Sequence, residues 1–143
     1  MPDTAESATR VETAKLIRAY YDAFNAGDSE AMLSMLADDV IHDVNQGERR
    51  QGKDKFRAFN ARMAHNYSEE LQDIAVMASK DGLRASAEFD VHGVDKNAEE
   101  GLPPAKGQKY VLPAGTFFAI RGGKITRVTT YYNLTDWMLQ VSA

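Results

Sequence analysis

The chain has 143 residues, of which 43% are hydrophobic and 27% are charged, which is the composition of an ordinary globular protein. A chain of this length supports one hydrophobic core, so we expect a single domain over residues 10–143 after a flexible N-terminal segment, residues 1–9. The net charge of -4 argues against a nucleic-acid partner, because binding to a phosphate backbone requires a clustered basic surface. The sequence contains no cysteine, which excludes disulfides and thiolate chemistry.

The N-terminal residues carry neither the basic start nor the apolar run of a secretory signal. No later apolar run is long enough to span a bilayer. We therefore expect a cytoplasmic protein without a membrane partner.

Helices are expected first. Thr9 and Glu12 have the spacing of a capping box, and the apolar residues that follow recur at helical intervals up to Phe24. Gly27 is expected to end this helix, and Asp28 to cap a short second one.

The segment 37–47 interleaves acidic, imidazole and amide side chains with valine and isoleucine, which predicts a strand. On such a strand His42 and Val44 point to one face, whereas Asp43 and Asn45 point to the other. A third helix is then predicted from apolar residues at helical period, namely Phe56, Phe59, Met63 and Tyr67.

The residue pattern in the second half of the chain predicts strands separated by turns. The predicted strands are 74–77, 84–92, 110–120 and 125–132, and a helical turn follows at 135–139. The polar segment from Gly93 to Lys109 is expected to form an extended loop or lid. Because strand 110–120 is apolar on both faces, we expect the helices to cover one face and a second subunit the other, giving a homodimer through the outer sheet face.

Four stretches resemble the ketosteroid isomerase-like, SnoaL-like branch of the NTF2-like superfamily. These stretches are Tyr20–Asp28, Leu36–Val40, Phe117–Ile125 and Tyr131-Tyr132. The resemblance implies an α+β cone of the NTF2-like (cystatin-like) kind, in which three helices from the N-terminal half pack on a strongly bent antiparallel sheet. It also implies a homodimer and a cup for a small apolar ligand.

The same resemblance separates this chain from a true ketosteroid isomerase, in which an Asp moves the proton while a Tyr and a protonated Asp hold the enolate oxygen. The tyrosine position falls on Tyr20, but the base position falls on Val44, with Asp43 beside it. The protonated-acid position falls on Gly115. The steroid isomerase triad is therefore not intact.

The resemblance places a mostly apolar cup around the candidate site. Its expected ligand-binding residues are Val44, Phe89, Phe117, Val128, Thr130 and Tyr132, with Trp137 near the mouth. The expected catalytic residues are His42, neutral and acting as a general base, and Tyr20, donating a hydrogen bond to a carbonyl oxygen. A one-residue bulge would instead turn Asp43 and Asn45 inward and make the base a carboxylate.

Three classes of function follow from these observations. The first is acid-base chemistry without a cofactor or metal, by an isomerase, cyclase or related enzyme acting on a small hydrophobic carbonyl compound. The second is non-catalytic binding of small molecules in the same cup. The third is an interaction module that uses the outer sheet face.

Overall fold

The computed structural model describes residues 2–143, with side chains from Thr9 onward. Within this range the protein is an α+β fold with one sheet and four helices. The elements are α1 (Pro2–Asn25), α2 (Ser29–Ser34), β1 (Leu36–Val44), β2 (Arg50–Gln51), α3 (Lys53–Asn66), β3 (Tyr67–Ala78), β4 (Arg84–Asp95), β5 (Lys109–Arg121), β6 (Lys124–Tyr132) and α4 (Leu134–Ser142). No helix of residues 2–143 is long and apolar enough to cross a membrane.

The helical region starts earlier than the sequence pattern indicated. Helix α1 begins at Pro2, so the predicted start at the Thr9 capping box is wrong. Proline is favoured in the first helical turn, and residues 3–8 contain no glycine or proline that would stop the helix. The expected flexibility of residues 1–9 stays a prediction, and residue 1 lies outside the described range.

The break between the first two helices follows the prediction. Gly27 adopts a φ of +71°, the left-handed conformation that glycine accepts without a steric penalty. Asp28 caps α2, because its side chain accepts a hydrogen bond from the Ala31 amide at 3.0 Å.

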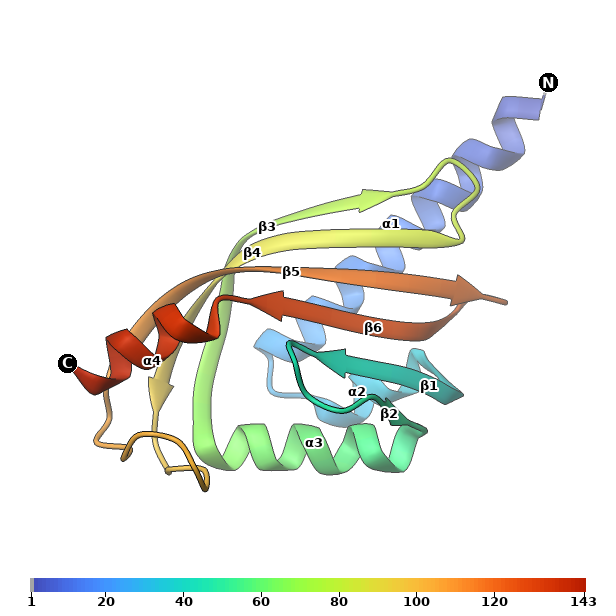
Figure 1. The fold of residues 1–143 in the computed structure, drawn as a ribbon. Helices are drawn as coiled ribbons and strands as arrows, with labels where there is room; N and C mark the ends of the chain where they lie inside the picture. Colours follow the sequence, from blue (N-terminus) through green and yellow to red (C-terminus); the bar gives the residue numbers. More distant parts are fainter. Residues whose placement is uncertain (1) are drawn as a thin grey trace.

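The six strands form a single sheet in the order β2-β1-β6-β5-β4-β3. Neighbouring strands are antiparallel except for β1 and β6, which are parallel. The sheet is strongly bent, and its strands curve around α1 and α3 (Figure 1). A register shift between Gln72 and Ala75 in β3 increases the local bend, as β-bulges do. The helices and the concave face of the sheet thereby enclose a cone.

Two element boundaries differ from the sequence expectation. Tyr67, placed on the third helix by its spacing, is the first residue of β3, where it pairs with Asp95. Strand β4 continues to Asp95 and β5 begins at Lys109, so the loop expected from Gly93 to Lys109 is shortened to residues 96–108. The start of β3 was interpreted as helix because Tyr67 continues the helical spacing of Phe56, Phe59 and Met63, and the end of β4 was interpreted as loop because it contains glycine and polar residues. The pairing of β3 with β4 overrides that weak local preference.

Candidate functional site

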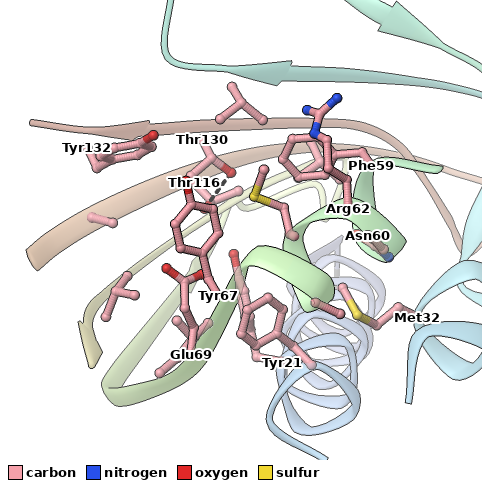
Figure 2. Close-up of a pocket in the computed structure, with 18 of the residues that line it drawn as sticks. Tyr21, Met32, Phe59, Asn60, Arg62, Tyr67, Glu69, Thr116, Thr130 and Tyr132 are labelled. Carbon is pink, nitrogen blue, oxygen red and sulfur yellow. Dashed lines mark hydrogen bonds between the residues drawn. The ribbon is translucent and has the colours of Figure 1, made fainter. Parts of the chain in front are cut away.

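A cavity of about 660 Å³ lies between α1, α3 and the concave face of the sheet. The cavity walls are mostly aromatic and aliphatic, and a small number of polar side chains point into it (Figure 2). This combination is typical of pockets for small organic ligands.

Most of the site residues predicted from sequence do line this cavity. They are Tyr20, His42, Val44, Phe89, Val128, Thr130, Tyr132 and Trp137. They come from α1, β1, β4, β6 and α4, so the bent sheet brings together residues that lie far apart in the chain. Their catalytic or binding roles stay predictions.

Three other predicted site residues lie outside the cavity. The Asp43 carboxylate accepts hydrogen bonds from Arg49 at 2.8 and 3.0 Å and from Thr129 at 2.8 Å. The Asn45 side-chain oxygen accepts the Tyr132 amide at 2.9 Å. Phe117 is 47% exposed. The alternative in which Asp43 and Asn45 turn inward is therefore wrong. The register shift in β1 lies between Leu36 and Ile41, and residues 41–44 pair with β6 without interruption.

The misplacement of Phe117 has the same origin as that of Asp43. Side chains alternate across a strand, and in β5 the neighbours Thr116 and Phe118 are the ones that face inward and are buried. Phe117 is consequently on the convex face, where its ring meets Tyr131 at a centroid distance of 6.1 Å.

His42 lies in an aromatic environment at one end of the cavity. Its ring stacks on Phe56 at 4.1 Å and meets the edge of Phe59 at 4.6 Å between centroids. Burial, helped by the positive charge of Arg50, lowers the pKa of His42 to about 4, against a smaller opposing effect of Asp43. The imidazole is therefore neutral at pH 7.

Tyr20 and Tyr21 line the cavity and pack against the buried ring of Phe118. Tyr20 meets Tyr21 and Phe118 edge to face, at centroid distances of 5.2 and 5.8 Å. Burial raises the pKa of both tyrosines, so their hydroxyls stay protonated and can donate hydrogen bonds. The neighbouring Thr116 side chain partly offsets the rise in the pKa of Tyr21, and its hydroxyl lies 3.2 Å from that of Thr130.

The functional group that sequence reasoning missed is Glu69 on β3. Its partly buried carboxylate lines the cavity and accepts a hydrogen bond of 2.5 Å from the Tyr110 hydroxyl. Burial raises the pKa of Glu69, although the bond from Tyr110 acts in the opposite direction. The available sequence signal was the alternation of Tyr67, Glu69 and Leu71, which puts these three side chains on one face of an early-starting strand.

A glycine on the intervening strand permits this contact. Glu69 pairs with Gly93 on β4, and Gly93 pairs in turn with Tyr110 on β5, so the three residues form one row across the sheet. The Tyr110 ring occupies the space where a Cβ on residue 93 would be. Only a residue without a side chain lets the tyrosine cross β4 to reach Glu69.

A second acidic group, Glu99, closes the same side of the cavity from the loop after β4. Its carboxylate accepts a hydrogen bond from Tyr67 at 2.7 Å and pairs with Arg62 at 3.3 Å. Unlike Glu69, it is therefore already matched by a positive charge. Among the described side chains, no group of three His, Cys, Asp or Glu is arranged to hold a metal ion.

Comparison with known proteins agrees with this geometry. The SnoaL-like domain profile matches residues 17–128, which is most of the chain. The protein belongs to the SnoaL-like family. Comparison with curated proteins gave no match.

Among the solved structures similar to this SnoaL-like protein, several are provisionally named polyketide cyclases. A protein of Pseudomonas putida KT2440, provisionally named a polyketide cyclase, is 59% identical over 90% of this chain and 97% of its own, with a TM-score of 0.89. One of Xanthomonas campestris pv. campestris with the same provisional name is 53% identical over 93% and 98%, with a TM-score of 0.91. A LEH-like epoxide hydrolase of Mycobacterium tuberculosis shares the fold at 15% identity, 93% and 91% coverage and a TM-score of 0.71.

Proposed function

We propose that this protein is an isomerase, cyclase or related enzyme that moves a proton next to the carbonyl group of a small hydrophobic compound. The observation that carries the proposal is the Glu69 carboxyl, which lines an apolar cavity and is held by a single hydrogen bond from Tyr110. An acid-base group works best when its pKa is near the working pH, and burial moves the pKa of Glu69 upward in that direction. The provisional cyclase names of the relatives fit this reaction class.

The proposed reaction starts with the Glu69 carboxylate removing a proton from the carbon beside the carbonyl. The electrons of the broken C–H bond move to the carbonyl oxygen, and the resulting enolate oxygen accepts a hydrogen bond from Tyr20 or Tyr21. Glu69 then returns the proton to another carbon, which is an isomerisation. In a cyclisation, the enolate carbon attacks a second carbonyl of the same molecule and Glu69 protonates the new alkoxide.

Glu69 is a better base for this step than His42, which was the base expected from the sequence. An imidazole whose pKa is about 4 holds a proton only weakly at pH 7 and therefore takes one from carbon less readily than a group of higher pKa. Glu69 and Tyr21 both direct their polar ends into the pocket (Figure 2). His42 is consequently assigned a binding role.

The proposal is tested by proton exchange on 2-tetralone, a small apolar ketone with acidic hydrogens beside its carbonyl. Exchange of these hydrogens in D₂O is followed by NMR for the wild type, Glu69→Gln and Glu70→Gln. Glu70 is the matched control because it follows Glu69 on β3 and is exposed. We expect Glu69→Gln to slow exchange by about 10²-fold or more and Glu70→Gln to leave it unchanged.

Two results would contradict the proposal. Wild-type exchange that survives in Glu69→Gln would remove Glu69 from the chemistry. A wild-type protein that binds 2-tetralone without accelerating its exchange would favour the non-catalytic binding function instead.

A further inference from the structure

Two residues at the end of the cavity away from Glu69 each have a buried nitrogen atom without a hydrogen-bond partner. Among the described side chains, these are the buried nitrogens left unpaired: Nδ1 of His42 and Nη1 of Arg50. The two residues are directly paired across β1 and β2, and both side chains line the cavity. Buried polar atoms in folded proteins nearly always have partners, so this pair indicates room for a bound group.

Phe59 of α3 holds both side chains in place. The Arg50 guanidinium lies over its ring, 4.8 Å from the centroid, while His42 meets the ring edge. A guanidinium stacked in this way keeps its N–H donors in the plane of the group, free to bind a planar acceptor. The aromatic ring therefore fixes the direction from which a ligand is bound.

Arg50 also lacks the acidic partner that neighbouring arginines have. Arg49 pairs with Asp43, Arg57 with Glu30 and Arg62 with Glu99. No such ion pair to Arg50 exists among the described residues. A positive charge with a buried, unpaired N–H group is stabilised by an anion, and a carboxylate matches the two-pronged geometry of guanidinium.

We propose that Arg50 and His42 bind a carboxylate of the substrate, at the opposite end of the cavity from the reacting carbonyl. The identity of the reacting end rests on the proposed function, whereas the carboxylate site rests on Arg50 and His42 alone. Phe59 and Glu69 lie on different sides of the pocket (Figure 2). From Phe59 to the start of β3, α3 rises roughly 10 Å, which is the length of a two-ring compound.

The test compares two ligands of nearly the same shape, 2-naphthoate and the neutral 2-naphthamide. Their dissociation constants are measured by calorimetry at pH 7 for the wild type, Arg50→Met, Arg50→Lys and Arg49→Met. Arg49 is the matched control, because it is the adjacent arginine and is paired with Asp43 outside the cavity. The wild type is expected to bind naphthoate about tenfold more tightly than naphthamide, as a charge-assisted hydrogen bond provides.

Arg50→Met is expected to abolish this preference by weakening naphthoate binding about tenfold. Measurable binding of naphthamide to the variant shows that the cavity is still formed. Arg50→Lys should keep part of the preference, and Arg49→Met all of it. Equal wild-type affinity for both ligands, or a preference that survives in Arg50→Met, would overturn the carboxylate site. Proton exchange on 2-tetralone by the wild type separates the two proposals: absent exchange together with a preference for naphthoate would overturn the proposed function and leave the carboxylate site standing.

Discussion

Tyr110 donates a hydrogen bond of 2.5 Å to Glu69 across a strand that lies between them, passing over Gly93. Three strands are needed for this contact. Strand β3 supplies the carboxylate, β5 supplies the hydroxyl donor, and Gly93 of β4 leaves the space through which the Tyr110 ring passes. The sheet therefore determines the position of the acidic group more firmly than a loop would.

Replacing Gly93 by alanine should break this arrangement. The new Cβ overlaps the Tyr110 ring, so the ring must move away from Glu69. We expect a loss of about 1–3 kcal/mol in the free energy of unfolding and a slower exchange of 2-tetralone hydrogens. Gly115→Ala is the control, since a Cβ there makes only an ordinary contact with Ala87 at 3.8 Å. Similar effects of both substitutions on exchange would contradict the role given to Gly93.

Removing only the Tyr110 hydroxyl should change the pH dependence of the reaction. The hydrogen bond from Tyr110 lowers the pKa of Glu69 against the larger, opposite effect of burial, so Tyr110→Phe should raise it further. A base must be ionised, and the acidic limb of the rate profile should therefore shift to higher pH. Tyr131→Phe on the convex face serves as control. A shift to lower pH would be inconsistent with Glu69 as the base.

His42 should make the protein less stable in mild acid. Burial keeps its pKa at about 4 in the folded chain, whereas the ordinary value is 6.5. Between pH 6.5 and pH 4 the histidine is protonated in the unfolded chain but neutral in the folded one. The free energy of unfolding therefore falls as the pH falls through this range, by up to about 3 kcal/mol.

The variant His42→Phe should lose this part of the pH dependence in urea unfolding, while the exposed His65→Gln variant keeps it. An unchanged slope between pH 4 and 6.5 in His42→Phe would show that other groups cause the acid sensitivity.

We propose a homodimer through the convex face of the sheet. Large hydrophobic side chains on β3, β5 and β6 remain exposed there, including Met77 at 49%, Phe117 at 47% and Tyr131 at 53%. Sedimentation velocity at micromolar concentration should show a dimer for the wild type and a folded monomer for Phe117→Glu. A monomeric wild type would refute the expected dimer.

Much of the fold was predictable because strands and turns leave local patterns in the sequence, namely the alternation of apolar residues and the position of glycine. The alternation in strand 84–92 and the turn at Gly27 correctly placed their elements. Period two also put His42 on the face of β1 opposite to Asp43, but it left open which of these faces lines the cavity. The resemblance to the SnoaL-like family then supplied the arrangement of helices and sheet. Aromatic and aliphatic lining residues such as Phe89 and Val128 came with it.

The acidic group was not predictable for a physical reason. Glu69 lies in a polar run that has low strand propensity, and its burial depends on pairing with β4, which is distant in sequence. The role of Gly93 likewise could not be predicted, because it depends on the pairing of three strands that places Glu69 and Tyr110 on either side of it. Arg50 was not among the predicted site residues, because β2 has only two residues and such a short strand shows no periodic pattern.

The most direct test of the central claim is the split between kcat and KM for exchange of 2-tetralone hydrogens in Glu69→Gln. If Glu69 moves the proton, kcat falls by about 10²-fold or more while KM stays within about twofold of the wild type, because the amide preserves the shape of the cavity. A raised KM with unchanged kcat would show that Glu69 only helps to bind the ketone and would contradict the account.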